Sequence, residues 1–362
     1  MKLLLIQPCL LPGAGSSITA QALLEGLVEQ GHDISYIALR STDVSMLDHL
    51  RAKNVKAETF DKQSNILLTI KLFRRVYSFK PDVIYGFGVT CNLIACIAGR
   101  MVGAKIISSY RGMPVVVRKR KKLLIPFINR FSDAVIAVSE AIKSQLVCSF
   151  ATPENKVHVV PPPIDHPHYE NFSSREPEKL YFVGRLHHDK GTDLLIKAMK
   201  HLPERFVLDI VGDGPQKQEL ESLAEMLSLR QRVSFIGYKK NIIPLLYEKA
   251  GLLVVPSRTE GLGRVILEAF AAGVPVVATR TGGIEELVYD RESGYLISGL
   301  LNPGKIATAI LRAAEDKQER CNIINSGLHI LAKYSKPQII KQTEAVMNSL
   351  FPAGNNSKAK HD

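Results

Sequence analysis

Two glutamates are the residues whose type and spacing most readily suggest chemistry in this 362-residue chain. Glu260 and Glu268 stand eight positions apart in the segment SRTEGLGRVILEAFAAGVPVVATRTGGIEELV. The spacing predicts one carboxylate in a glycine-rich loop and the other two turns into the following helix, with the N–H groups of Gly263, Arg264 and Val265 exposed at the helix start. A diphosphate could bind these N–H groups, and the two carboxylates could hold a hydroxyl-rich sugar at each of its ends.

Two cations follow a strand pattern in the same half of the chain. The run KLYFVGRLHHDKG places Arg185 and Lys190 between a predicted strand and a predicted helix. Such cations suit a diphosphate, although this spacing alone is more often a solvated loop. The strand pattern 232–237 ends at Gly237 and Tyr238, where exposed backbone could meet a base, but a tight turn explains the same residues.

Apolar strand patterns and amphipathic helix patterns alternate in both halves of the chain. The predicted strands are 3–7, 33–39, 82–87, 104–110 and 133–139 in the first half, and 179–184, 206–212, 232–237, 251–257, 275–279 and 294–297 in the second. This alternation is typical of parallel sheets with crossover helices. It predicts an α/β fold of two Rossmann-like, doubly wound domains that face each other across a deep cleft.

The Pro-rich polar segment 161–179 separates the two halves and indicates a linker. We therefore expect an N-terminal domain over residues 1–172 and a C-terminal domain over 173–336. The last helical pattern, 337–350, follows the second sheet, and we expect it to pack back on the N-terminal domain. The remaining residues, 351–362, have the composition of a flexible tail.

Composition restricts the class of protein. No apolar run reaches the roughly 18 to 20 residues of a membrane span, and the first apolar run is better explained as a buried strand than as a signal peptide. Five scattered cysteines without metal or disulfide spacing favour reduced thiols in the cytoplasm. The formal net charge of +12 is compatible with nucleic acid, anionic lipid or anionic small substrates.

Taken together, these motifs resemble the Glu-x7-Glu signature of retaining, GT-B-fold glycosyltransferases of family four (glycosyl transferases group 1), of the bacterial cell-envelope or polysaccharide type. The resemblance extends over nearly the whole chain. Besides the glutamates it includes VGRLHHDKG (183–191), VGDGP (211–215), VSFIG (233–237), GGIEELV (282–288) and AVSEAI (137–142).

The resemblance implies a role for each site residue. Arg185 and Lys190 are similar to the pair that binds the donor diphosphate, and with Glu260 they are the expected catalytic residues. Glu268 matches the residue that holds the ribose, and Glu260 the one that contacts hydroxyls of the transferred sugar. The other expected donor-binding residues are Gly237, Tyr238, Gly261, Gly263, Arg264 and Val265, together with Gly13, Gly15 and Ser16 in the N-terminal glycine loop.

The chain departs from the family pattern at three places. Arg111 stands before Gly112 where many relatives have a histidine near the reacting sugar, so we expect Arg111 on the acceptor or sugar side of the site. The glycine loop reads GAGSS rather than a plain Gly-Gly. Three consecutive prolines, 161–163, replace the usual Pro-Asn-Gly before the linker and should stiffen it.

We expect the reaction to need no metal or other cofactor. The nucleotide sugar itself is a substrate rather than a cofactor. The sequence contains no Asp-x-Asp motif to hold a divalent ion. Arg185, Lys190 and the helix start can instead neutralise the charge that develops on the leaving diphosphate. A glycoside hydrolase would also use two carboxylates, but its mechanism has no place for the two cations.

The resemblance implies transfer, with retention, from a nucleotide-diphosphate sugar to a glycan or lipid-linked acceptor in lipopolysaccharide, capsule or exopolysaccharide biosynthesis. A UDP-sugar is favoured over a GDP-sugar. Two alternatives remain open: a GT-B-fold sugar-nucleotide epimerase or phosphorylase, and a non-catalytic nucleotide-sugar-binding protein. Nucleic acid is disfavoured as a partner because the basic run has no interleaved stacking aromatics.

One basic run lies between apolar groups in the segment GMPVVVRKRKKLLIPFINRF (112–131). A solvated face explains such a run equally well. The flanking apolar residues, including Ile125 and Ile128, favour an interfacial segment on an anionic inner leaflet, and hence a cytoplasmic protein peripheral to the plasma membrane. The cations expected to contact the membrane are Arg118, Lys119, Arg120, Lys121 and Lys122.

Overall fold

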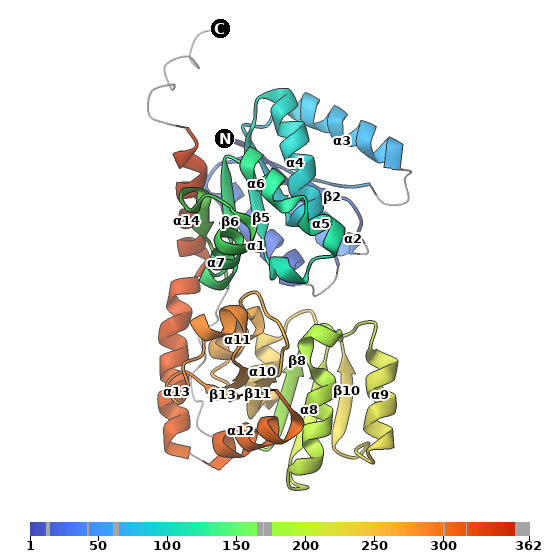
Figure 1. Cartoon of the computed structure of the whole chain (residues 1–362), viewed down its shortest axis with the longest axis vertical. Coiled ribbons are helices and arrows are strands. Elements are labelled where there is room, and N and C mark those ends of the chain that lie inside the picture. Colours follow the sequence, from blue (N-terminus) through green and yellow to red (C-terminus); the bar gives the residue numbers. More distant parts are fainter. Residues whose placement is uncertain are drawn as a thin grey trace. The chain divides into compact units, whose positions relative to one another are not determined.

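The computed structural model describes residues 1–11, 15–41, 43–60, 65–164, 169, 176–297, 299, 301–315 and 317–351, of which 65–69 and 317–318 are described by their backbone alone. The chain forms two compact units (Figure 1). Unit 1 comprises Met1–Pro163 and Lys336–Asp362, and unit 2 comprises Ile164–Ser335. The expected boundary after residue 172 and nearly all of the expected tail lie outside the described residues.

Unit 1 is built on a parallel sheet that has seven strands within the described residues, in the order β3-β2-β1-β4-β5-β6-β7. The strands are β1 (Lys2–Gln7), β2 (Asp33–Ala38), β3 (Lys56–Thr59), β4 (Val83–Phe87), β5 (Lys105–Tyr110), β6 (Ala134–Ala137) and β7 (Val157–Val159). β3 and β7, which lie at the two edges, have no counterpart among the strands predicted from the sequence.

Helices cover both faces of this sheet. Leu3 and Leu5 of β1 belong to one apolar core, while Leu4 and Ile6 on the opposite face are also fully buried. Burial on both faces is expected for a parallel sheet with crossover helices. The helices are α1 (Gly15–Glu29), α2 (Val44–Ala52), α3 (Asn65–Phe79), α4 (Gly88–Val102), α5 (Lys119–Lys122), α6 (Ile125–Phe131) and α7 (Glu140–Phe150), with short 3-10 helices at Pro114–Val116 and Glu154–Lys156.

The last helix, α14 (Lys336–Ser349), belongs to unit 1 and packs against α1. A side chain at Gly26 would bring its Cβ within 2.5 Å of Ile340, so glycine permits this close approach. At the helix start, Lys336 lies 3.4 Å from Glu29. The contact therefore joins segments from the two ends of the chain in one core.

Unit 2 contains a second parallel sheet, with six strands among its described residues in the order β10-β9-β8-β11-β12-β13. The strands are β8 (Lys179–Val183), β9 (Val207–Val211), β10 (Val233–Gly237), β11 (Leu252–Val255), β12 (Val276–Thr279) and β13 (Tyr295–Ile297). The helices are α8 (Thr192–Ala198), α9 (Lys217–Met226), α10 (Ile243–Lys249), α11 (Arg264–Ala271), α12 (Pro303–Glu315) and α13 (Lys317–Leu331), with 3-10 turns at His188–Lys190, Met199–His201, Gly282–Glu286 and Ala332–Tyr334. Both units are thus Rossmann-like, as predicted.

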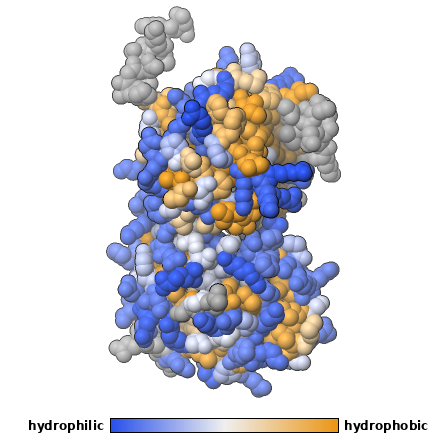
Figure 2. Space-filling model, viewed as in Figure 1, coloured by the Kyte–Doolittle hydropathy of each residue, from blue (hydrophilic) through white to orange (hydrophobic). Residues whose placement is uncertain are grey.

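On the face shown in Figure 2, hydrophilic and apolar side chains alternate, and an apolar area lies over α4 and α6 of unit 1. Among the described residues, no helix is both long and apolar enough to cross a membrane.

Candidate functional site

The predicted site residues of unit 2 lie around the carboxyl ends of β8 and β11, which are neighbouring parallel strands. The strand order changes direction between these two strands, because β9 and β10 continue on one side of β8 while β11 starts the other side. In open α/β sheets, ligands bind outside the carboxyl ends of the strands at such a switch point. The loop after β8 carries Arg185 and Lys190, and the loop after β11 carries Glu260.

Lys190 and Glu260 form an ion pair between these two loops. Lys190 Nζ donates a hydrogen bond to Glu260 Oε2 at 2.6 Å, and Ser257 Oγ donates to the same oxygen at 3.2 Å. The Glu260 side chain is 14% exposed and that of Lys190 is 30% exposed. Both groups are therefore held by protein contacts while remaining open to a ligand.

Arg258 ties the same two loops together. Its backbone N–H donates to Asp189 O at 2.7 Å, and its guanidinium donates to His188 O at 2.8 Å. The guanidinium also makes two hydrogen bonds, of 2.7 and 2.8 Å, to the carboxylate of Asp193 in the first turn of α8. Burial alone would raise the pKa of Asp193, but hydrogen bonding and charge from Arg258 outweigh it and lower that pKa. Asp193 in turn raises the pKa of Arg258.

A glycine brings the β8 loop into contact with the end of β11. Gly191 has φ +67°, and a Cβ there would lie 2.0 Å from the carbonyl oxygen of Pro256. A larger residue would be strained and would push the loops apart. The residue after Lys190 is therefore glycine because the backbones meet at this point.

The start of α11 follows a second glycine with positive φ. Gly263 has φ +91° and directly precedes Arg264, the first residue of the helix. Glu268 is only 8% exposed, and its Oε1 accepts a hydrogen bond from Arg264 Nε at 2.9 Å. The prediction that Glu268 lies two turns into the helix is wrong: the helix begins at Arg264, so Glu268 lies about one turn in, at an i,i+4 spacing.

The charged side chains of this site are largely paired. Glu260, Glu268 and Asp193 are each paired with a cation. Arg185 is exposed, and none of the described carboxylates forms an ion pair with it. Asp189, in the same loop as Lys190, lies 3.3 Å from His187 and is a fourth carboxylate. The four cations and four carboxylates therefore balance, and the N–H groups at the start of α11 are the feature that favours an anion.

Gly237 and Tyr238 lie at the end of β10, two strands from β8. Gly237 has φ +75°, and its carbonyl oxygen accepts a hydrogen bond from Gly212 N at 3.0 Å. Tyr238 is partly exposed. These residues share the carboxyl edge of the sheet with the loops that carry the glutamates.

The remaining predicted residues belong to unit 1. Gly13 lies outside the described residues, while Gly15 and Ser16 begin α1. Arg111 follows β5, and its guanidinium carbon lies 3.9 Å from the ring centroid of Phe87 at the end of β4. The order of this sheet also changes direction at β1 and β4. Arg111 is thus held next to the switch point of unit 1 by stacking on an aromatic ring.

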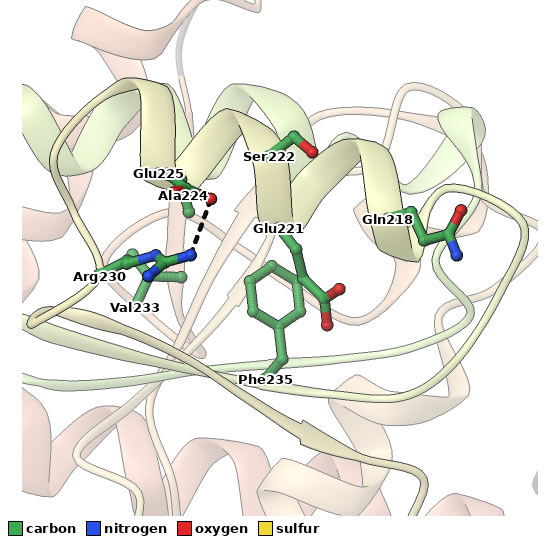
Figure 3. Close-up of a pocket in the computed structure, with 8 residues that line it drawn as sticks. All are labelled: Gln218, Glu221, Ser222, Ala224, Glu225, Arg230, Val233 and Phe235. Carbon is green, nitrogen blue, oxygen red and sulfur yellow. Dashed lines mark ion pairs between the residues drawn. The ribbon is translucent and has the colours of Figure 1, made fainter.

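An open pocket of about 420 Å³ lies elsewhere in unit 2, between α9 and β10 (Figure 3). Phe235 of β10 and Glu221 of α9 both line it, and Arg230 is paired with Glu225 at 2.8 Å. None of the predicted site residues lines it. We therefore place the candidate site at the switch point rather than in this pocket.

Sequence reasoning missed Ser257, Arg258 and Asp193. All three lie within or beside the quoted motifs, but their function depends on a contact between loops that are distant in the chain. The signal that could have found them is the position of Arg258 two residues before Glu260, combined with an acidic residue in the first turn after the Lys190 loop.

Both units are Rossmann-like domains, and the switch point of unit 2 has a helix start that suits an anion. These features define a protein of the GT-B class. Comparison with known proteins agrees. The family model "Glycosyltransferase Family 4" matches residues 13–167, and the model "Glycosyl transferases group 1" matches residues 168–329. The chain belongs to the glycosyltransferases, enzymes that transfer sugars.

Individual relatives cover nearly the whole chain. An uncharacterized glycosyltransferase of Methanocaldococcus jannaschii is 35% identical over 91% of this chain and 93% of its own length. The N-acetyl-alpha-D-glucosaminyl L-malate synthase of Bacillus anthracis is 24% identical over 99% of this chain and 100% of its own. The structure of Anabaena HepE in complex with UDP-glucose has a TM-score of 0.85 at 23% identity, covering 96% of this chain and 100% of that one. This last likeness supports the GT-B fold.

Proposed function

We propose that this glycosyltransferase uses a nucleotide-diphosphate sugar as donor, a UDP-sugar ahead of a GDP-sugar, and that it transfers the sugar with retention of configuration. The observation that carries the proposal is the arrangement around the start of α11. There the Lys190–Glu260 and Arg264–Glu268 pairs stand on the two sides of Gly263, and Arg185 is a further exposed cation in the loop after β8. The complex of HepE with UDP-glucose supports a UDP-sugar by analogy.

Each group has a proposed part in donor binding. The diphosphate lies against the N–H groups of Gly263, Arg264 and Val265, where the helix dipole favours negative charge. Glu268 accepts hydrogen bonds from the ribose hydroxyls. Glu260 accepts hydrogen bonds from hydroxyls of the transferred sugar. Gly261 belongs to the same loop, and the backbone at Gly237 and Tyr238 faces the base.

The transfer step requires stabilisation of the leaving nucleotide diphosphate. Arg185 and Lys190 supply two positive charges where that charge develops, and Glu260 orients Lys190 through the 2.6 Å contact. We therefore propose catalysis without a metal ion. The acceptor hydroxyl attacks the face of the sugar that the diphosphate leaves, and a diphosphate oxygen takes its proton, so the anomeric configuration is retained.

For unit 1, we propose that the glycine loop with Gly13, Gly15 and Ser16 approaches the donor phosphates and that Arg111 contacts the sugar or the acceptor. The proposed acceptor is a glycan or lipid-linked intermediate in lipopolysaccharide, capsule or exopolysaccharide biosynthesis. The proposed location is the cytoplasm, on the inner face of the plasma membrane.

The first experiment is a thermal-shift panel of UDP- and GDP-sugars with the wild-type protein. A donor at 100 times its dissociation constant should stabilise the protein by about 2.7 kcal/mol. Absence of a shift with every nucleotide sugar would contradict the proposal.

Variants then separate the two glutamates. Glu268→Ala should weaken binding of the sugar nucleotide and of the free nucleotide alike, because both contain the ribose. Glu260→Ala should suppress transfer more than it weakens binding of the free nucleotide. Glu285→Ala, which breaks a solvent-exposed pair with Arg280, is the matched control and should change neither quantity.

Two further assays test the reaction itself. Turnover should persist after treatment with a chelator, and loss of turnover without unfolding would refute metal independence. Product formation without any acceptor would point to an epimerase, and dependence on free phosphate would point to a phosphorylase. The anomeric configuration of the product, read by NMR coupling constants, tests retention.

A further inference from the structure

Exposed apolar side chains gather on two neighbouring helices of unit 1. Met101 at the end of α4 is 66% exposed, Leu123 before α6 is 81% exposed, and Phe127 on α6 is 51% exposed. Ile97 and Phe131 are exposed on the same helices. Large exposed apolar groups that cluster in this way mark an interaction site on a folded protein.

These side chains form one surface because α4 and α6 are tied together. Arg100 on α4 donates a hydrogen bond to Phe131 O at 3.0 Å, and its guanidinium carbon lies 5.9 Å from the Phe131 ring centroid. The rings of Phe127 and Phe131 are 4.6 Å apart. Figure 2 shows the result as an apolar area over α4 and α6, with hydrophilic side chains of the neighbouring α5 segment beside it.

The charge around this surface is strongly one-sided. Residues 83–132 contain nine Lys or Arg and no Asp or Glu. Of the five consecutive cations, Arg118, Lys119, Arg120 and Lys121 are exposed. Lys121 Nζ donates to Thr90 Oγ1 at 2.9 Å, which holds the basic run beside α4. Cations therefore border the apolar side chains in a part of the chain without any carboxylate.

The structure also changes which residues can contact a partner. Ile125 and Ile128, expected from the sequence to face a membrane, are fully buried because they form the inner face of α6. Ile97 and Met101 of α4, which the sequence did not suggest, take their place. The surface is thus formed by two helices rather than by one continuous segment.

We propose that this surface docks on an anionic lipid bilayer. The apolar side chains of α4 and α6 enter the boundary between headgroups and acyl chains, and the cations at 118–122 contact anionic headgroups. A second copy of the chain would bring the same cations against each other, which opposes self-association. If the proposed function holds, the enzyme would reach its lipid-linked acceptor at this bilayer surface. Lipid binding itself requires no donor.

Co-sedimentation with vesicles tests the proposal on the full chain. One set is phosphatidylcholine and the other is phosphatidylcholine mixed with phosphatidylglycerol. Wild type should bind the anionic vesicles, and salt should weaken this binding. Replacing all five cations at 118–122 by Gln should lower the partition coefficient about fivefold per charge, from about 1 kcal/mol each, and thus more than about a hundredfold in total.

A second variant tests the apolar side chains of the surface. Leu123→Ser with Phe127→Ser should lower partitioning onto anionic vesicles by about tenfold or more, because both side chains lose their burial in lipid. The matched controls lie in unit 2. Met226→Ser removes a side chain that is 77% exposed on α9, and Lys239→Gln with Lys240→Gln removes two exposed cations. Both controls should bind vesicles nearly as wild type does.

Three results would overturn the proposal: equal binding to neutral and anionic vesicles, binding that the surface variants do not weaken, or a lipid-free dimer in sedimentation velocity that Phe127→Ser dissociates. The thermal shift with nucleotide sugars, measured on the same variants, separates this proposal from the proposed function. Lost vesicle binding with an unchanged donor shift supports a distinct lipid surface. Vesicle binding without any donor shift refutes the proposed donor and leaves the lipid surface standing.

Discussion

The pair formed by Arg258 and Asp193 makes the sharpest prediction for unit 2. Their side chains are 25% and 19% exposed, so this ion pair is intermediate between a solvent-exposed pair and a fully buried pair. Removing one partner costs about 3–5 kcal/mol for a buried pair, while an exposed pair contributes about 0.2–1 kcal/mol. We therefore expect Arg258→Gln to cost about 2–3 kcal/mol, since it also removes the hydrogen bond to His188 O.

A double-mutant cycle isolates the pair. Asp193→Asn should cost about 1–2 kcal/mol, and the double variant should cost little more than Arg258→Gln alone, which gives a coupling energy of about 1–2 kcal/mol. Urea unfolding followed by circular dichroism supplies the free energies. The exposed pair of Arg280 and Glu285 is the control, with an expected coupling below about 0.5 kcal/mol. Additive effects at Arg258 and Asp193 would refute the reasoning.

Substitution of Arg258 should also affect donor binding at the site. Because Arg258 joins the two loops, its loss should loosen the contact between Lys190 and Glu260 and weaken donor binding in the thermal-shift assay. Arg258→Lys, which keeps the charge but not the bidentate geometry, should recover only part of the binding. Full donor affinity in Arg258→Gln would show that the pair supports stability alone.

The other predictions concern packing and pH. Gly191→Ala should destabilise the protein by about 3 kcal/mol or more in urea unfolding, because its Cβ would lie 2.0 Å from Pro256 O at a positive φ. Gly26→Val should cost about 1–3 kcal/mol by the same assay, because Ile340 occupies the space a side chain needs. Burial lowers the pKa of His158 below its ordinary value of 6.5, so the unfolded chain binds the proton more readily. Stability should therefore decrease as pH falls below about 6.5, and His158→Gln should flatten this part of a melting-temperature profile.

Matched substitutions keep these outcomes interpretable. Gly112→Ala adds a Cβ where no atom lies within 4 Å and should leave the free energy of unfolding nearly unchanged. An equal loss at Gly112 and Gly26 would mean that the close approach of α14 is not the cause. A pH profile that His158→Gln leaves unchanged would assign the acid sensitivity to other groups.

Much of the fold could be predicted from the sequence because central parallel strands are buried on both faces and form continuous apolar runs. All six strands of unit 2 were predicted, and so were the five central or near-central strands of unit 1. The two that were missed, β3 with sequence KAET and β7 with sequence VHV, are short edge strands. Edge strands have polar residues on their open side, so their pattern is hard to distinguish from a loop.

For the candidate site, the sequence predicted the features that depend on local spacing and missed those that depend on contacts between distant loops. Local spacing was enough to place Glu260 before a helix and Glu268 within it, since glycines mark the helix start. The contacts between Lys190 and Glu260, 70 positions apart, and between Arg258 and Asp193, 65 positions apart, depend on β8 lying next to β11. That adjacency skips the two strands that follow β8 in the chain, and no pattern within either loop specifies it.

The same reasoning explains why the apolar surface of unit 1 differs from its prediction. Along the chain, Ile125, Phe127 and Ile128 are equally apolar neighbours, and only the rotation of α6 against the sheet buries two of them and exposes the third. A helical period predicts that residues three apart share a face, which fits Ile125 and Ile128 together, but it does not say which face is turned inward. Packing of α6 against α4 makes that choice, and it places α4, with its exposed Ile97 and Met101, alongside the helix that carries Phe127. A peptide of residues 112–131 would expose Ile125 and Ile128, which are buried in the protein, and would lack the side chains of α4. Membrane binding should therefore be measured on the full chain.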